Sequence, residues 1–404
     1  MTPAPRTGHG TTPPTPRHRL AAVVATLVAL ALAACSGSAG ASGASGDATT
    51  PAATSAAPVE RTRTTVTDET GREVELDLPV ASVASGLGGN QYILELIRAV
   101  GDPSRVIAAT ESQINTPGWA GYWDDFAFYD EESPVFVAGE TGSFNYDRLI
   151  ELKPDVLLTG SNSPWQEAEA KLEPFGIKVL VFTAWEPRFS DHNIALLGEL
   201  FGTQDRAERY TASLTGEIEA LLAERLAGLK EEDKVRVYFE GQKDYVAGIP
   251  GGWDWVIRYA GGANIYSDIV INGGLGWNQI DVDPADIVSR DPEFIIKNGV
   301  ADKPQGLYEP WTRAEFEATA QALVSRPGFE HVDAVKNGRV WVTNNYLVSA
   351  ASKWVGALYL ATWLYPERFE GVDPEQYFRA WVEEYQSSQY HPAEDYVHHA
   401  GAER

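Results

Sequence analysis

Aromatic and amide side chains recur in glycine-rich segments that each follow a short apolar run, and this combination suits the binding of an organic ligand. Aromatic faces stack on flat or apolar groups, while glycines let backbone amides approach closely. A tryptophan in a glycine-rich loop has less reason to be buried than one in a helix, so we expect Trp123 and Trp277 in particular to contact the ligand. The full set of candidates is Trp119, Tyr122, Trp123, Trp165, Trp185, Arg188, Tyr245, Trp253, Trp277, Asn345 and Tyr346.

The charges near these residues favour a neutral or cationic ligand. The chain carries a formal net charge of -25, which weighs against nucleic acid or an anionic membrane surface as a partner. Few basic residues lie in the candidate loops, whereas a strongly anionic ligand calls for a cluster of arginines. The basic residues are Arg188, Lys243, Arg313 and Lys353, and the neighbouring acids include Glu111, Glu140 and Glu186.

Other kinds of chemistry find weaker support in the sequence. The single cysteine, Cys35, excludes disulfides within the chain and thiolate metal sites in the folded part. His192 and His331 are isolated from other metal-ligating residues, so we expect no metal site. The alternative class is an exported carbohydrate-active enzyme or carbohydrate-binding surface protein. It would use Glu186 beside Trp185 and Asp254 between two tryptophans.

The amino-terminal part has the pattern of an export signal. Residues 1–35 place arginines before an apolar run that ends at Cys35, and the segment 32–35, LAAC, resembles the bacterial lipobox. In that motif the cysteine receives a diacylglycerol and the chain is cut just before it, which implies lipid attachment at Cys35. A plain secretory signal with a chance cysteine is the alternative. Residues 36–62 are small and polar and predict a disordered tether, so we expect the folded part to be anchored at the outer face of the cell membrane.

Between the candidate loops, the sequence alternates short apolar runs with helical patterns. Residues 64–78 predict a hairpin around Thr70-Gly71, and the later units predict mostly parallel sheets covered by helices. The fold class is therefore α/β, with two Rossmann-like lobes at 63–202 and 231–390. In such folds ligands lie beyond the carboxyl ends of the strands, where the candidate loops fall. A polar tail follows at 391–404, with His391, His398 and His399; we expect it to be mobile, and weak metal binding by these histidines is the alternative.

Two features of the sequence concern the relation between the lobes: a repeated pattern that occurs once in each, and a helix that connects them. Residues 147–158 and 285–296 share one design, a short helix that ends before a proline followed by an apolar strand, which indicates an internal repeat. Residues 204–230 show apolar positions at three- and four-residue steps and predict one long connecting helix, placed at 203–230. With Gly216 as its only weak point before Gly228, it should act as a rigid strut and limit motion of the lobes.

Five stretches resemble, in the same order, the binding proteins of ABC importers that carry iron complexes, haem and vitamin B12. They are residues 65–74, 145–158, 291–296, 334–340 and 360–369. The resemblance implies two lobes joined by one helix, a ligand in the cleft between them, no covalently bound cofactor and no enzymatic activity. It further implies a monomer that meets an ABC permease with its ATPase.

In that family an acidic residue on each lobe meets arginines of the permease. Asp147 stands at the first of these positions; at the second stands Ala285, and Asp286 beside it is the candidate. Both acids could instead be favoured only by the helix dipole. Trp277 falls where corrinoid-carrying relatives place a ligand-stacking tryptophan. Together with the charge pattern, the resemblance favours a ferric hydroxamate siderophore, with a corrinoid or haem as the alternatives.

Overall fold

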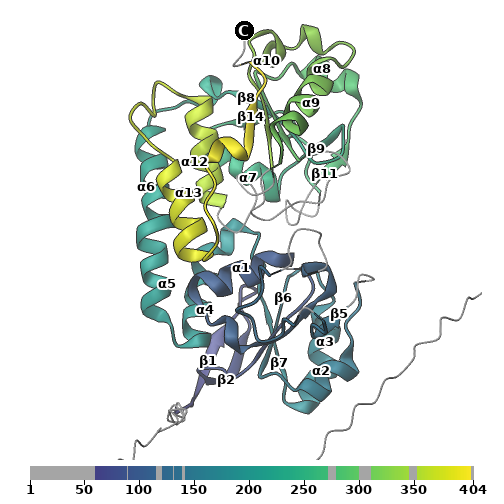
Figure 1. Cartoon of the computed structure of the whole chain (residues 1–404), viewed down its shortest axis with the longest axis vertical. Helices are drawn as coiled ribbons and strands as arrows, with labels where there is room; N and C mark the ends of the chain where they lie inside the picture. Colours follow the sequence, from purple (N-terminus) through teal and green to yellow (C-terminus); the bar gives the residue numbers. More distant parts are fainter. Residues whose placement is uncertain are drawn as a thin grey trace, which may run out of the picture. The chain divides into compact units, whose positions relative to one another are not determined.

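The structure is a computed structural model and describes residues 60–88, 90–114, 121–130, 132–138, 142–271, 279–299, 311–344 and 353–401. Cys35 and nearly all of the predicted signal and tether lie outside these residues. The described part contains two separate main sheets, one in each half of the sequence, as the α/β prediction requires (Figure 1).

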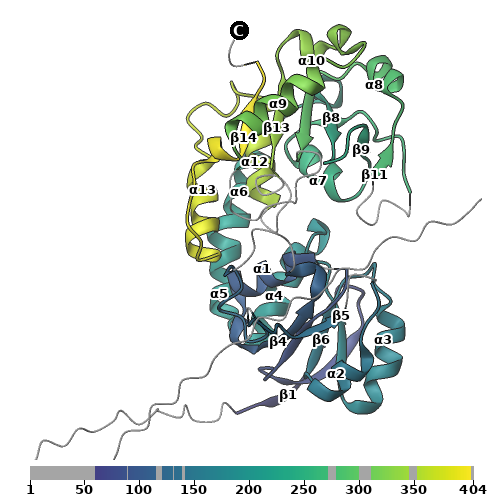
Figure 2. The same cartoon turned by 45° about the vertical axis from the view of Figure 1, so that its right-hand side comes forward.

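The first lobe is built on a parallel five-stranded sheet with the order β5-β4-β3-β6-β7. Its strands are β3 (Val83–Ser85), β4 (Val106–Thr110), β5 (Phe136–Ala138), β6 (Val156–Thr159) and β7 (Lys178–Val181). Its helices are α1 (Asn90–Val100), α2 (Tyr146–Leu152), α3 (Trp165–Leu172) and α4 (Ser190–Phe201). Alternate strand residues pack with α1 and α4 on one face and with α2 and α3 on the other (Figure 2). Every residue of β6 is buried, which explains why the strand is apolar up to Thr159.

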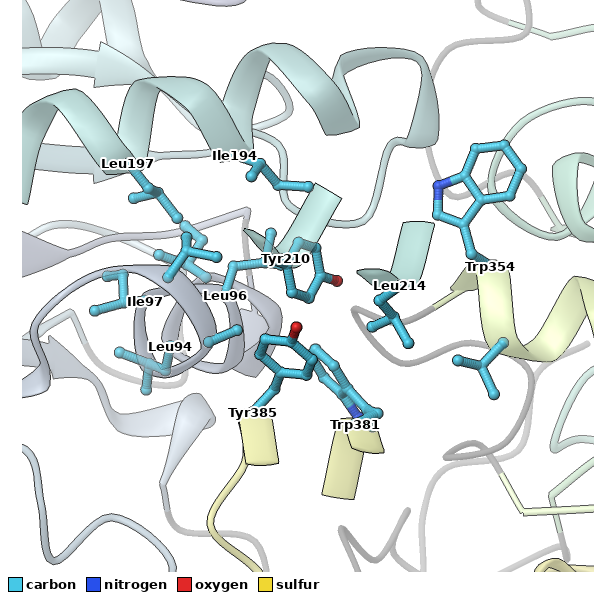
Figure 3. Close-up of a cluster of buried hydrophobic side chains, with 14 of the residues drawn as sticks. Leu94, Leu96, Ile97, Ile194, Leu197, Tyr210, Leu214, Trp354, Trp381 and Tyr385 are labelled. Atoms are coloured by element: carbon cyan, nitrogen blue, oxygen red, sulfur yellow. The ribbon is translucent and has the colours of Figure 1, made fainter. Parts of the chain in front are cut away.

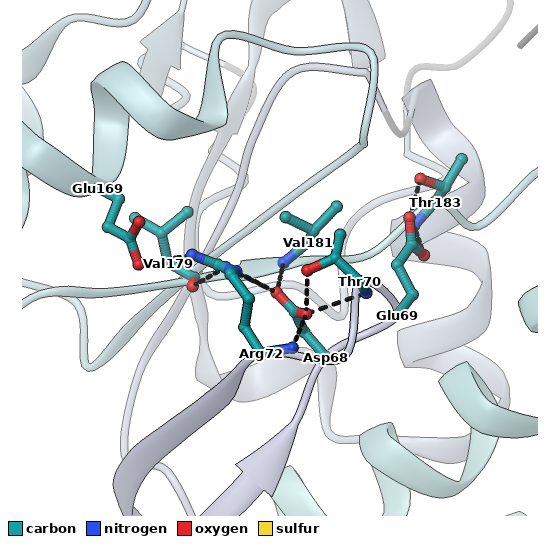
Figure 4. Close-up of polar contacts among 8 residues, drawn as sticks. All are labelled: Asp68, Glu69, Thr70, Arg72, Glu169, Val179, Val181 and Thr183. Carbon is teal, nitrogen blue, oxygen red and sulfur yellow. Dashed lines mark hydrogen bonds and ion pairs between the residues drawn. The ribbon is translucent and has the colours of Figure 1, made fainter. Parts of the chain in front are cut away.

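The predicted hairpin is present as β1 (Thr62–Thr67) and β2 (Glu73–Leu78), and its turn is fixed to the sheet by Asp68 (Figure 4). The Asp68 carboxylate accepts hydrogen bonds from the Thr70 hydroxyl at 2.6 Å, from the Arg72 guanidinium at 2.6 Å, and from the main-chain N–H of Val181 at 3.1 Å. Burial alone would raise the pKa of Asp68, but these hydrogen bonds outweigh it and hold the pKa below its usual value. The hairpin is therefore attached to β7 through a buried, ionised carboxylate.

The second lobe contains a sheet whose centre, β8-β12-β13, is parallel and whose flanks include antiparallel pairs. Its strands are β8 (Arg236–Glu240), β9 (Val246–Gly248), β10 (Ala263–Asn264), β11 (Gln279–Asp281), β12 (Phe294–Asn298), β13 (Val340–Thr343) and β14 (Val397–His399). Its helices are α7 (Gly252–Tyr259), α8 (Pro284–Arg290), α9 (Arg313–Val324), α10 (Asp333–Lys336), α12 (Lys353–Leu364) and α13 (Glu375–Ala380). One face packs against α7 and α12, and the other against α8, α9 and α10.

The expectation of a mobile tail at 391–404 is wrong for its central part. β14 pairs antiparallel with β13, and Tyr396 just before it is fully buried. The His399 ring stacks on Trp341 with centroids 3.8 Å apart. β14 lies at the edge of the sheet and its three residues are only partly buried, so its sequence can be polar and resembles that of a tail.

The internal repeat is confirmed. α2 and α8 are both seven residues long, and both end at a residue in the left-handed region, Lys153 with φ 49° and Asp291 with φ 42°. Each is followed by a proline and then by a central strand, β6 or β12. Because proline cannot continue a helix, the same local sequence ends the helix in both lobes.

The connecting helix is present but shorter and less regular than predicted. It consists of α5 (Gln204–Tyr210), a π-helical turn at Thr211–Thr215, and α6 (Gly216–Arg225). It ends before Lys230 because Leu226 leaves the helical conformation and Gly228 takes φ 74°. A helix with a wide turn in its middle is not the uniform strut that the sequence pattern predicts.

Candidate functional site

Loops at the carboxyl end of the first sheet are tied to one another by hydrogen bonds. The Thr159 hydroxyl at the end of β6 donates to the main-chain oxygen of Leu87 after β3, at 2.7 Å. The Ser161 N–H after β6 donates to the Thr183 hydroxyl after β7, at 2.9 Å. Three of the predicted ligand loops therefore form one continuous polar edge.

Glycine is required where two of these loops meet. Gly88 has φ 76°, and a Cβ on Gly160 would lie 2.4 Å from the main-chain oxygen of Gly88. A side chain at either position would push the loops after β3 and β6 apart. The glycines predicted to permit close approach thus serve contact between loops in this structure.

Trp185 lies at this edge and joins the two lobes. Its indole N–H donates to the main-chain oxygen of Gly88 at 2.8 Å, and its own main-chain oxygen accepts from Lys353 Nζ on α12. Trp185 and Lys353 are both buried. Desolvation lowers the pKa of Lys353 to about 7, and the nearby Glu186 carboxylate opposes this shift only in part.

Arg188, another predicted ligand residue, is already paired. Its guanidinium binds both oxygens of Glu186, with Nε–Oε1 at 2.9 Å and Nη2–Oε2 at 2.8 Å. Hydrogen bonding to Glu186 raises the pKa of Arg188, so its guanidinium stays charged. Glu186 is buried, which makes this bidentate pair a fixed part of the loop after β7.

The carboxyl end of the second sheet carries a cluster of four charges, of which Glu240, Lys297 and Arg326 are buried and Asp244 is exposed. Glu240 ends β8 and binds Lys297 Nζ of β12 at 2.8 Å and both terminal nitrogens of Arg326 at 2.7 and 2.9 Å. Asp244 binds the same two cations at 2.9 and 2.8 Å. Burial alone would raise the pKa of Asp244, but its hydrogen bond with Lys297 holds that pKa below the usual value. Two acids and two bases therefore balance one another.

Tyr245 is held in an unusual conformation by this cluster. It has φ 58°, its N–H donates to Glu240 Oε2 at 3.1 Å, and the Arg326 guanidinium lies 4.4 Å from its ring centroid. A left-handed tyrosine costs conformational energy and persists only where neighbouring contacts fix it. The cluster thus fixes the β8–β9 loop and with it one predicted ligand residue.

Other predicted aromatic contacts are placed in or against the core. Trp123 is completely buried and packs on Phe126, and Trp253 is 1% exposed and stacks on Phe239 with centroids 4.4 Å apart. The expectation that these two rings face a ligand is therefore wrong for this structure. Glycine-rich neighbours in sequence did not reveal the aromatic packing around them.

Tyr122 and Trp165 are partly exposed. The Tyr122 hydroxyl donates to Gln386 at 2.9 Å, and the Arg72 guanidinium lies 4.3 Å from the Trp165 ring centroid. Neither contacts Trp185 through a hydrogen bond or ring contact among the described residues. Trp119, Trp277, Asn345 and Tyr346 lie outside the described residues and stay predictions.

The two predicted docking acids differ in their surroundings. Asp147 is exposed in the first turn of α2, and within the described part of the chain it makes no ion pair. Asp286 binds Arg290 at 2.9 Å, and Arg290 also binds Asp268 at 2.7 Å. The Asp286 charge is therefore shared within its own lobe.

The charge cluster of the second lobe was missed from the sequence. Its signal was available, since Lys297 and Glu240 directly follow the apolar runs FII and VYF within strands β12 and β8. A charge in a buried strand needs a partner, and that requirement could have located the cluster.

Across the described residues, no helix is long and apolar enough to span a membrane, and no group of three or more histidine, cysteine or acidic side chains could hold a metal ion.

Comparison with known proteins is consistent with this arrangement. The sequence profile of the family described as periplasmic binding protein matches residues 114–347. The molybdate-binding protein MolA of Haemophilus influenzae is 20% identical over 285 residues, covering 63% of this chain and 74% of MolA. The uncharacterized lipoprotein MJ0878 of Methanocaldococcus jannaschii is 21% identical over 288 residues, covering 69% of this chain and 64% of the lipoprotein. The solved TroA-like periplasmic binding protein FepB of Veillonella parvula is similar with a TM-score of 0.68 at 20% identity, covering 83% of this chain and 99% of FepB.

Proposed function

The chain belongs to the periplasmic binding protein family and is a solute-binding component of an ABC importer, and we propose that its ligand is a ferric siderophore of the hydroxamate type. The ligand is bound between the loops at the carboxyl ends of the two sheets and is then passed to a permease. Catalysis has no part in this role.

One observation carries the choice of ligand. The basic side chains described near these loops already have acidic or carbonyl partners: Arg188 has Glu186, Lys243 has Asp281, Arg313 has Glu317, Lys297 and Arg326 have Glu240 and Asp244, and Lys353 has the Trp185 oxygen. An anionic ligand would have to displace these partners, which costs free energy. A neutral or cationic chelate would not.

The loop segments outside the described residues add little positive charge. Residues 115–120, 272–278 and 345–352 contain no lysine or arginine, and residues 300–310 contain only Lys303. Both molybdate, the ligand in the name of the relative MolA, and a ferric tricatecholate are anions, so each is disfavoured by the same reasoning. A corrinoid and haem remain the alternative ligands of the same importer type.

The carbohydrate-active alternative loses support. Its two acids are held by internal partners, because Glu186 pairs with Arg188, and Asp254 binds Arg258 at 2.6 Å and Asn264 at 3.1 Å. A general acid must be able to reach its substrate and donate a proton to it, whereas both of these carboxylates already bind side chains of the protein. Unchanged turnover of any glycan in Glu186→Gln would exclude that acid from catalysis.

Titration of tryptophan fluorescence tests the proposal, since the chain has 12 tryptophans. A ferric trihydroxamate should quench the fluorescence with micromolar or tighter affinity, about -8 kcal/mol or stronger. The panel should also contain a ferric tricatecholate, cobalamin, haemin and molybdate. Tight binding of molybdate or the tricatecholate, without the trihydroxamate, would refute the charge argument.

We further propose lipid attachment at Cys35, supported by the lipobox and by the lipoprotein relative. Attachment of acyl chains would hold the protein at the extracytoplasmic face of the membrane. In host cells, Cys35→Ser should abolish acyl-chain labelling and release the protein from washed membranes. Continued labelling of the variant would place the lipid elsewhere.

A further inference from the structure

The connecting helix changes partners at its π-helical turn. Before the turn, α5 packs on α4 and α1 of the first lobe; after the turn, α6 packs on α12 of the second lobe. The wide turn at Thr211–Thr215 therefore lies at the point where the chain passes from one lobe to the other. π-helical turns of this kind are often found at functional positions and at bends in helices.

A second helical segment, α13 and the residues after it, also reaches from one lobe to the other and also contains a π-helical turn. The Phe378 ring of α13 contacts Tyr359 of α12 in the second lobe, with centroids 6.3 Å apart. A π-helical turn follows at Trp381–Tyr385, and then Gln386 donates to the main-chain oxygen of Glu95 in α1 at 3.1 Å. Both of these helical segments thus carry a π-helical turn where they pass from one lobe to the other.

Hydrogen bonding defines both turns. The N–H of Gly216 donates to Thr211, and the N–H of Gln386 donates to Trp381 at 2.9 Å, each across five residues instead of four. A Cβ on residue 216 would lie 2.8 Å from the Thr211 oxygen, so the first turn requires its glycine. The Ser213 hydroxyl donates to the Arg209 oxygen at 2.8 Å, a contact that favours bending of a helix.

The two turns contact each other directly (Figure 3). Tyr210, just before the first turn, packs edge-to-face on Tyr385 with centroids 4.9 Å apart, and contacts Trp381 at 6.2 Å. The hydroxyls of Ser213 and Tyr385 are hydrogen-bonded at 2.9 Å. Tyr210 and Trp381 are buried, so a movement at one turn must be accommodated by the other.

We propose that these paired π-helical turns form the pivot about which the two lobes reorient. Each flanking helix stays attached to its own lobe, while the wide turns absorb the change in backbone angles, as hinge residues do. The connecting helix then consists of two rigid segments, α5 and α6, which change their relative orientation at Thr211–Thr215. This inference does not depend on the identity of the ligand.

Hydrogen exchange of the ligand-free full chain tests the coupling between the turns. Tyr385→Phe removes one hydroxyl but keeps the ring, and it should speed exchange roughly fivefold at both residues 212–217 and residues 382–386. Tyr259→Phe, which removes a hydroxyl from α7, should alter neither segment. Acceleration confined to residues 382–386, or absent from both segments, would overturn the proposal.

Distance measurement by pulsed electron paramagnetic resonance tests the pivot itself. The full chain with Cys35→Ser has no other cysteine, so spin labels can be placed through Glu151→Cys in the first lobe and Glu330→Cys in the second. Gly216→Ala should shift the interlobe distance distribution, because the added Cβ conflicts with the turn. Ala220→Gly on the exposed side of α6 should leave the distribution unchanged. A distribution that is the same in Gly216→Ala and the parent chain would contradict the pivot.

Discussion

Lys353 Nζ donates a hydrogen bond to the main-chain oxygen of Trp185, so a buried lysine of the second lobe is bound to a ligand-edge loop of the first. The same loop carries the Glu186–Arg188 pair. Contact between the lobes at the proposed ligand site therefore depends on a group whose charge changes near neutral pH.

The buried lysine should make stability depend on pH in the alkaline range. Its folded-state pKa is lowered to about 7, below the unfolded value of 10.5, so its contribution is greatest above pH 10.5 and is lost as the pH falls toward 7. Urea unfolding should show stability rising from pH 7 to pH 9 by up to about 1.4 kcal/mol per pH unit from this group. Lys353→Met should remove that slope, whereas Lys243→Met, at an exposed position, should retain it. Equal slopes in the parent chain and Lys353→Met would show that Lys353 does not titrate here.

Removing one acid from the charge cluster should destabilise the second lobe strongly. Glu240→Gln leaves Lys297 and Arg326 buried with only Asp244 as an acidic partner, and the expected loss is about 3–5 kcal/mol. The exposed pair Lys243–Asp281 provides the control, since Asp281→Asn should cost less than about 1 kcal/mol. Both values come from urea unfolding at pH 7, and a small loss in Glu240→Gln would mean that the cluster is solvated.

Trp123 should behave as a core residue. Trp123→Ala leaves a cavity beside Phe126, and unfolding should become easier by about 3–5 kcal/mol. Phe175→Ala is the control, because the Phe175 ring is 47% exposed and its truncation should change stability by less than about 1 kcal/mol. If Trp123→Ala kept full stability and lost only ligand binding, the sequence-based role as a ligand contact would be restored.

Asp147, the exposed acid in the first turn of α2, should affect delivery of the ligand to the permease and not binding of the ligand. Asp147→Ala should leave ligand affinity unchanged but reduce uptake in cells roughly tenfold, the effect of losing about 1.4 kcal/mol of docking energy. Glu151→Ala changes another exposed acid on the same helix and serves as the matched control. Normal uptake by the Asp147 variant would remove this residue from the docking surface.

Local sequence signals predicted much of the fold. The helix, proline and strand pattern located α2 and α8 with their following strands, because proline and the left-handed caps at Lys153 and Asp291 act over a few residues. The glycine-rich loop that begins at Gly86 was correctly placed after β3 for the same reason.

The site depends on contacts that are distant in sequence, and these were not predicted. Trp123 is a local exception, because Phe126, on which its ring packs, is only three residues away, and its glycine-rich neighbourhood still did not show this packing. Glu240 and Arg326 are 86 residues apart. The π-helical turn at Thr211–Thr215 does not change the apolar spacing enough to be recognised, although Gly216 marked its position.

The docking of Asp68 onto the N–H of Val181 has a consequence for the order of folding. The two groups are 113 residues apart, so the hairpin formed first in the chain gains its buried partner only after β7 has been made. Contacts of such long separation slow folding, because a large loop must close before they form. A growing chain that stops short of β7 would leave the Asp68 carboxylate without the Val181 donor. We therefore expect the first lobe to acquire its native packing only when about half of the chain is complete.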